Sequence, residues 1–200
     1  MSSKKRPARQ ERRPGVIRPL ARLAAAAALG FAAMDRIHDA DERARSVVAG
    51  RRSEFLDQTL PVITDLGSMY AAGGAAAALY LGGKRKLARD VIGASALAWG
   101  IAQAAKRVFA RPRPYDAGEV ELLVRRPAGT SYPSGHPAVA GAMVGVVAPD
   151  VPSFVGAPLA RLPRFIGFSR VYVGAHYPSD VAGGVLIGKA VAELWRRFSS

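Results

Sequence analysis

The sequence predicts an all-helical bundle, and three observations support this fold class. Long apolar runs rich in Ala, Leu, Val and Gly recur along the 200 residues, and 50% of the residues are hydrophobic. Clusters of Gly and Pro separate these runs. No stretch of any length alternates apolar and polar residues, which is the pattern of a half-buried strand. The composition excludes a wholly disordered chain, and the length fits one domain.

About six helices are expected. Their predicted bounds are residues 19–35, 61–83, 88–106, 136–149, 152–169 and 178–196. The first contains an uncharged run from Leu23 to Met34 behind a basic flank, as the core of a signal peptide also does. No convincing small-x-small cleavage site precedes Asp35, so we interpret the run as an uncleaved helix. Residues 35–58 alternate acids and bases and predict a solvated or interfacial helical segment.

The charge of the chain is strongly positive, with 29 Lys and Arg against 15 acids and a formal net charge of +14. Such an excess requires an anionic partner, which is nucleic acid, a membrane surface or a phosphorylated substrate. Residues 1–18 are basic and rich in proline, and predict a disordered cytoplasmic tail that holds an anionic leaflet. Residues 19–200 are then expected to form a single helical domain. The tail has no aromatic residues to stack on bases, so no nucleic acid is expected.

The chain has no cysteine, which excludes disulfide scaffolds, zinc ribbons and thiolate catalysis. Hydropathy is equivocal, because the mean hydropathy is +0.08 and most apolar runs are shorter than the about 20 residues of a spanning helix. Charge topology is more informative. Six crossings place the tail, the basic cluster Lys84–Arg89 and the pair Arg196-Arg197 on one side, in agreement with the positive-inside rule. We therefore expect a multi-pass protein of the cell membrane. Gly184 and Gly188 have a spacing that permits close helix packing.

The first of three candidate site motifs follows the third predicted helix. Lys106 stands near the helix end, and Arg113 comes seven residues later in an Arg-Pro-Arg-Pro segment. Prolines fix φ and push the preceding residue out of the helical region, so Arg113 is expected on stiff backbone with Lys106 pointing toward it. The alternative is a basic helix flank beside lipid headgroups.

The second motif is Pro-Ser-Gly-His, which ends at His136. Ser134 suits an N-cap, and Gly135 lets a ligand approach the backbone. A helix that begins here directs free N–H groups and its positive dipole end at an anion, with His136 beside it. Taken alone, the tetrapeptide also fits an ordinary turn.

The third motif, Ser-Arg-x5-His-x3-Asp, contains Arg170, His176 and Asp180. Because Pro178 suits the opening turn of a helix, the Asp180 carboxylate is expected to reach back to one imidazole nitrogen of His176. The other nitrogen is then unprotonated and faces outward. Arg170 offers a planar fork to an oxyanion. The alternative is a structural His–Asp pair at a helix start.

Together these motifs resemble the three signatures of the type 2 phosphatidic acid phosphatase superfamily, with a match at every signature position between residues 106 and 180. The resemblance implies a transmembrane helical bundle and a lipid phosphatase that needs neither metal nor cofactor. The implied substrates are phosphatidate, phosphatidylglycerophosphate or a polyprenyl mono- or diphosphate. Because the motifs fall opposite the basic termini, catalysis is expected on the non-cytoplasmic side of the membrane.

The same resemblance implies a role for each motif residue. His176 is expected to take the phosphoryl group as a phosphohistidine, with Asp180 fixing its tautomer. His136 is expected to protonate the leaving oxygen and then to activate water. The groups expected to neutralise the phosphate oxygens are Lys106, Arg113, Arg170, Ser134 and the Gly135 N–H. A magnesium site is not expected, since the motifs lack the necessary density of carboxylates.

Two alternatives remain open at this point. One is a soluble acid phosphatase or vanadate-dependent haloperoxidase of the same superfamily, because the same pocket binds vanadate. The other is a non-enzymatic basic protein that binds anionic lipid at the membrane surface through its tail. The second alternative explains the positive charge of the chain but does not explain why the three motifs occur together.

Overall fold

The computed structural model describes residues 15–118 and 120–199. Within these ranges the chain forms helices and no strand, so the predicted all-α fold class is confirmed. The α-helices are α1 (Ile17–Asp35), α2 (His38–Ala49), α3 (Glu54–Thr64), α4 (Met69–Leu81), α5 (Arg85–Phe109), α6 (Gly135–Val147), α7 (Ser153–Leu159), α8 (Leu162–Tyr172) and α9 (Pro178–Phe198). Three 3-10 helices join them, η1 (Asp65–Gly67), η2 (Pro114–Ala117) and η3 (Ala148–Asp150).

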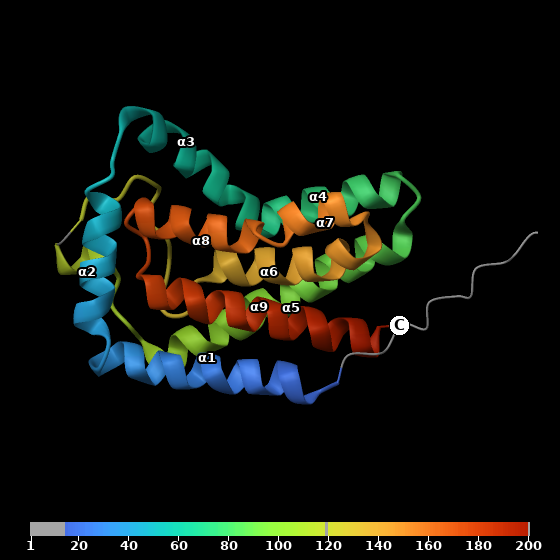
Figure 1. The fold of residues 1–200 in the computed structure, drawn as a ribbon, viewed down its shortest axis with the longest axis horizontal. Coiled ribbons are helices and arrows are strands. Elements are labelled where there is room, and N and C mark those ends of the chain that lie inside the picture. The colour runs from blue at the N-terminus through green and yellow to red at the C-terminus, as the bar shows by residue number, and fades with distance from the viewer. Residues whose placement is uncertain (1–14, 119, 200) are drawn as a thin grey trace, which may run out of the picture.

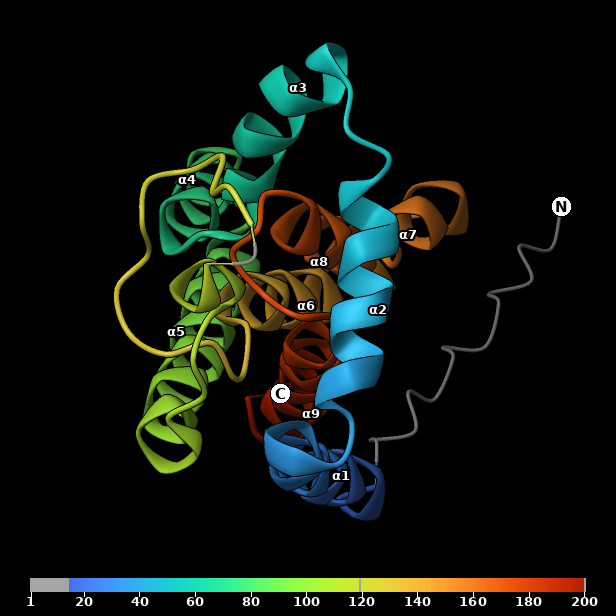
Figure 2. The same cartoon turned by 90° about the vertical axis from the view of Figure 1, so that its left-hand side faces the viewer.

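Helix α6 is the centre of the bundle, and α5, α8 and α9 pack around it along the long axis of the molecule (Figure 1). Helix α1 lies along α9 on the outside. Helix α2 turns away from this direction and crosses one end of the bundle (Figures 1 and 2). The loop between η2 and α6 lies at the same end, so this end is built from segments far apart in the sequence.

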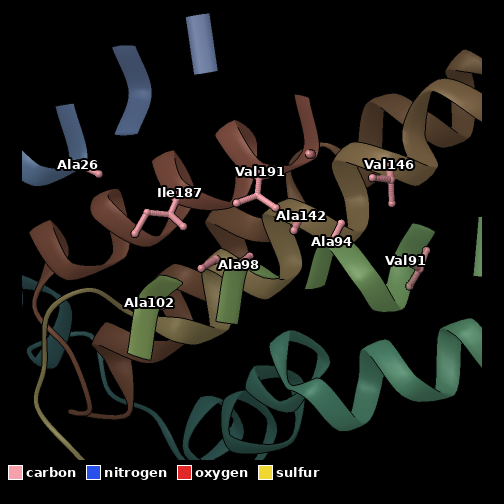
Figure 3. Packing of buried hydrophobic residues seen from close by; sticks show 11 residues of the cluster. Ala26, Val91, Ala94, Ala98, Ala102, Ala142, Val146, Ile187 and Val191 are labelled. Carbon is pink, nitrogen blue, oxygen red and sulfur yellow. The ribbon is translucent and has the colours of Figure 1, made fainter. Parts of the chain in front are cut away.

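The core between α5, α6 and α9 consists mainly of small side chains, which let the helix backbones approach closely (Figure 3). Gly188 shows how close α6 and α9 are, because a Cβ added there would lie 2.4 Å from the carbonyl oxygen of Ala138. The expectation that this Gly-x-x-x-Gly spacing permits close packing is therefore confirmed for Gly188. The tight packing holds the start of α6 beside the start of α9.

Replacing Gly188 by Ala is expected to destabilise the protein. Its new methyl group would push against backbone, which cannot rotate away, and overpacking of this kind costs about 1–3 kcal/mol. For a chain of this size that corresponds to a fall of roughly 2–12 °C in the apparent melting temperature of the purified protein. Gly100→Ala is the matched control, since no atom lies within 4 Å of its added Cβ. Equal melting temperatures for the two variants would contradict the close contact.

Two of the expected helices are wrong as single helices. The predicted helix 61–83 is divided among α3, η1 and α4, because Gly67 lies against the next layer, where an added Cβ would be 2.8 Å from the carbonyl oxygen of His136. Ser68 then starts α4 and accepts a hydrogen bond from the N–H of Ala71 with its side chain. The predicted helix 152–169 is divided into α7 and α8, because Pro163 occupies the first turn of a new helix, where its missing N–H costs nothing.

The segment 35–58 is helical over much of its length, as expected, but its description as solvated is wrong for two residues. Asp41 and Arg45 of α2 are only 5% and 7% exposed. The reason is tertiary, since α2 packs against α8 and α9 where it crosses the end of the bundle. Two of the alternating charges of this segment are therefore buried between helices and do not face solvent.

Most of the tail predicted for residues 1–18 lies outside the described residues. Its last two residues already belong to α1, so the helix begins at Ile17 rather than at residue 19. In the described part of the chain, α1 is the one helix long and apolar enough to cross a membrane by length and composition. The start of α1, the basic start of α5 and the end of α9 all lie at the end of the bundle opposite α2 (Figure 1).

Candidate active site

The three motifs meet at the end of the bundle that α2 crosses. The end of α5 supplies Lys106, the segment after it supplies Arg113, and the start of α6 supplies Ser134, Gly135 and His136. The end of α8 supplies Arg170, the turn after it His176, and the first turn of α9 Asp180. Because α5, α6, α8 and α9 pack side by side, their ends bring these residues together.

His176 is the centre of the site, and its two ring nitrogens face different groups. Its Nδ1 lies 3.4 Å from Oδ2 of Asp180, and its Nε2 lies 3.2 Å from Nη1 of Arg113. The side chain is buried. Burial, together with the nearby guanidinium of Arg113, lowers the pKa of His176 well below 6.5, so the ring is neutral at neutral pH. A proton on Nδ1 toward the acid leaves the lone pair of Nε2 directed at the cations.

Arg113 is held in place by three backbone carbonyl groups. Its Nε donates to Gly129 at 2.8 Å, its Nη1 to Ala175 at 2.9 Å and its Nη2 to Ala128 at 3.2 Å. The residue is 2% exposed, so this guanidinium is a buried charge with a fixed orientation beside His176. The stiff placement expected from the flanking prolines agrees with this geometry.

Arg170 and Ser134 have polar atoms that lack a partner. Nη1 of Arg170 donates to Oγ1 of Thr64 at 3.4 Å, but its Nε is buried without a hydrogen bond. Ser134 occupies the predicted N-cap position of α6, yet its hydroxyl caps no N–H and is likewise buried without a partner. Unsatisfied buried polar atoms are costly, at about 1–3 kcal/mol each. Their presence here indicates a site for a polar ligand. Because the free donor of Arg170 belongs to a positively charged guanidinium, that ligand is expected to be an anion.

His136 and Arg170 line a cavity of about 410 Å³ that also contacts Asp65 of η1 and Arg125 of the loop before α6. The His136 Nε2 lies 3.9 Å from Oδ1 of Asp65. In front of Gly135 the backbone is open, because an added Cβ there would meet no atom within 4 Å. An anion in this cavity therefore has access to the first turn of α6 and to its dipole.

Lys106 is buried, and its ammonium is bound to the loop that precedes α6. Its Nζ donates to the carbonyl of Thr130 and, at 3.2 Å, to that of Ser131. The same loop binds Arg113, so the two cations of the first motif are held by one segment. The three basic side chains of the motifs, Lys106, Arg113 and Arg170, are all buried.

The comparison with protein-family models identifies the family. The model of the PAP2 superfamily matches residues 87–200, more than half of the chain, and this range contains all three motifs. The chain belongs to the PAP2 superfamily. The resemblance drawn from the motifs is thereby confirmed.

Individual relatives of this PAP2 chain act on different lipids. The chain is 37% identical over 93 positions to the undecaprenyl-diphosphatase BcrC of Bacillus subtilis. These positions make up 46% of this chain and 47% of that protein. The chain is also 36% identical over 107 positions to a decaprenylphosphoryl-5-phosphoribose phosphatase of Mycobacterium tuberculosis, covering 52% and 57%. The chain thus spans about half the length of the curated relatives it matches.

A solved structure extends the fold comparison to nearly the whole PAP2 chain. The transmembrane PAP2-type phosphatidylglycerolphosphate phosphatase of Bacillus subtilis superposes with a TM-score of 0.74. The match covers 90% of this chain and 95% of that structure at 22% sequence identity. At this identity the comparison shows a shared fold, including the helices that lie before the family match.

Three polar residues beside the PAP2 motifs were missed by the sequence analysis. Arg111 donates from Nη1 to Oδ1 of Asp180 and from Nη2 to Oδ2 of Asp41, both at 2.8 Å. The hydroxyl of Ser131 donates to Oδ2 of Asp180. The Arg-Pro-Arg-Pro repeat was a signal for Arg111, since residues i and i+2 of an extended segment lie on the same side, which places Arg111 near Arg113. No signal in the sequence marked Asp41.

In residues 15–118 and 120–199, no three side chains of His, Cys, Asp or Glu are grouped so that they could hold a metal ion. Arg125 and Arg170 line the cavity together with one acid, Asp65, so positive side chains exceed negative ones there.

Proposed function

We propose that this chain is an integral membrane lipid phosphatase that hydrolyses a lipid phosphomonoester or diphosphate through a phosphohistidine on His176, without a metal ion. The carrying observation is the environment of His176. It is buried and neutral, with Nδ1 toward Asp180 and Nε2 toward the cation Arg113. A neutral imidazole oriented by an acid is a nucleophile, and the cations around it attract its anionic target.

The first half of the reaction transfers the phosphoryl group to the enzyme. The lone pair of Nε2 of His176 forms a bond to phosphorus while the bond from phosphorus to the leaving oxygen breaks. His136, which lines the cavity, gives a proton to that oxygen. The developing charge on the phosphate oxygens is met by Arg113, by the free Nε of Arg170 and by the free hydroxyl of Ser134.

The second half releases inorganic phosphate. Water, which gives up a proton to His136, attacks phosphorus, and the bond from phosphorus to Nε2 of His176 breaks. The electron pair returns to the imidazole, so the ring is neutral again and ready for the next substrate. Asp180 stays ionised beside Nδ1 throughout and stabilises the positive charge that the ring carries in the intermediate.

The membrane assignment is supported by the relatives and by the ends of the bundle. The fold is that of a protein described as transmembrane, and the relatives act on lipid-linked phosphates. The basic cluster Lys84–Arg89 at the start of α5 and the end of α9 lie opposite the site. Since basic ends stay in the cytoplasm, the site faces the non-cytoplasmic side, where a lipid keeps its tail among the helices while its phosphate enters the cavity.

Phosphate release from the purified protein in detergent tests this function. The substrates are phosphatidate, phosphatidylglycerophosphate, undecaprenyl diphosphate and a water-soluble phosphate ester. We expect kcat/KM for at least one lipid to exceed that for the soluble ester, because a retained tail supplies binding energy. No release from any lipid would contradict the proposal, and preference for the soluble ester would favour the acid phosphatase alternative.

Inhibitors are expected to separate this mechanism from a metal-dependent one. Orthovanadate should compete with substrate, because five-coordinate vanadium on Nε2 of His176 mimics the phosphorus in transfer. A chelator such as EDTA should leave activity unchanged, since the charge on phosphate is met by Arg113 and Arg170. Activity that depends strictly on added magnesium, measured after chelation and dialysis, would contradict this prediction.

A further inference from the structure

A buried ion network joins α2 to the catalytic acid. Asp41 of α2 accepts a hydrogen bond from Nη2 of Arg111, and Asp180 of α9 accepts one from Nη1 of the same guanidinium, each at 2.8 Å. Asp41 also accepts from the backbone N–H of Ser179 at 2.9 Å and from the Ser179 hydroxyl. The guanidinium of Arg111 thus bridges two acids that are 139 positions apart in the chain.

Because this network is buried, the ionisation of its carboxylates depends on a cation within the network. Asp180 is 0% exposed, Asp41 5% and Arg111 3%. An ionised carboxylate without a partner at such a depth is strongly disfavoured, so it becomes protonated or the site rearranges. Arg111 is the cation in direct contact with the carboxylate of Asp180.

Arg111 is oriented away from the phosphate cavity. Nη1 is shared between Asp180 and the hydroxyl of Ser179, Nη2 binds Asp41, and the guanidinium lies over the ring of Tyr177 at 4.1 Å from its centroid. None of these contacts is to the groups that line the cavity beside His136. Arg111 therefore differs from Arg113, whose guanidinium faces Nε2 of His176.

We propose that Arg111 is a positioning residue that keeps Asp180 ionised, and that Asp41 balances and orients Arg111. This inference rests on the proposed phosphatase function. An ionised Asp180 accepts the proton of Nδ1 of His176 and leaves Nε2 free to attack. A protonated Asp180 would instead donate to Nδ1, and the ring proton would then sit on Nε2, where it blocks attack. The network acts on the rate of the chemical step and leaves phosphate binding alone.

The test compares Arg111→Met, Asp41→Asn and the double variant, using phosphate release from the lipid that wild type turns over best. Arg111→Met is expected to lower kcat about 100-fold, with KM within about threefold of wild type. This loss is smaller than the roughly 10⁴-fold fall in kcat that follows when a triad acid itself loses its charge. Asp41→Asn alone should lower kcat less than about fivefold, since Arg111 still faces Asp180. The double variant should recover at least about fivefold over Arg111→Met, because one of two buried anions that lack a cationic partner is gone.

Recovery in the double variant separates charge balance from a structural role. If Arg111 served only to tie α2 to α9, changing Asp41 to Asn as well would remove the oxygen that accepts from the Ser179 hydroxyl, weaken the tie further and lower kcat again. A double variant no more active than Arg111→Met would therefore overturn the proposal. A fall in kcat of no more than about threefold for Arg111→Met would also overturn it, because the loss of an orienting charge is expected to lower kcat far more.

Arg111→Lys is the second arm and decides the case if Arg111→Met does not fold. It keeps one cation between the two carboxylates, so kcat is expected within about tenfold of wild type with KM unchanged. A loss of more than about 100-fold in a folded Arg111→Lys would overturn the proposal, because charge alone would then be insufficient. Arg107→Met is the matched control, an exposed arginine of α5 four positions earlier. Wild type that releases no phosphate would refute the proposed function itself rather than the role of Arg111.

Discussion

His176→Ala is expected to abolish turnover, with a fall in kcat of about 10⁴-fold or more, the scale seen when a nucleophile is removed from an enzyme. The variant removes the ring nitrogen that faces the guanidinium of Arg113, while Arg113 keeps its three carbonyl partners. Phosphate affinity should therefore change little. Steady-state phosphate release measures the loss, and vanadate or phosphate binding measures the retained pocket.

The phosphohistidine itself gives a second measurement for the same variant. Wild type mixed with labelled substrate and quenched quickly should carry labelled phosphate, and His176→Ala should carry none. His38→Ala is the matched control, because His38 lies in α2 outside the cavity, and its activity should stay within about threefold of wild type. Label that persists in His176→Ala, or turnover close to wild type, would exclude this residue as the nucleophile.

Arg170→Met is expected to lower kcat/KM by about 10²–10³-fold, the usual effect of removing one preorganised donor to a developing oxyanion. The structure shows why this arginine matters: it is 3% exposed, and its Nε is buried without a partner. Its charge is compensated when an anion binds. Methionine fills a similar volume, so packing in α8 is largely retained while the donor fork is lost.

The control for this prediction lies on the same helix. Arg164 is exposed on α8, and Arg164→Met should stay within about twofold of wild type in kcat/KM. Phosphate release at several concentrations of the best lipid substrate measures both variants. If Arg170→Met loses no more than Arg164→Met, the cavity between His136 and Arg170 is not where the phosphate reacts.

The sequence alone was sufficient for the fold class and for the residues that carry the proposed chemistry. Apolar runs without strand alternation predicted helices because burial of one face of each helix is the main requirement of a bundle. The spacing of His176 and Asp180 predicted their contact because Pro178 starts a helix and brings residues of its first turn back toward the chain that enters it. These are local relations, and local geometry follows from residue type.

The break inside residues 61–83 was harder to predict, because packing rather than propensity interrupts that helix. Nothing in the composition of residues 61–83 requires an interruption at Gly67, which is needed because this glycine lies against the backbone of His136. In the same way, the charges of residues 35–58 are typical of a solvated surface, and only the crossing of α2 over the bundle buries Asp41.

The sequence by itself predicted that a lysine, two arginines, two histidines and an acid stand near one end of a helical bundle, in an order typical of one family. Tertiary structure decided which arginine does what. In the Arg-Pro-Arg-Pro segment the two guanidinium groups point to different sides, and the packing of α2 and α9 places two acids on the side of Arg111 and His176 on the side of Arg113. The physical reason is that a buried charge takes its role from the opposite charges that folding brings to it, and those come from distant parts of the chain.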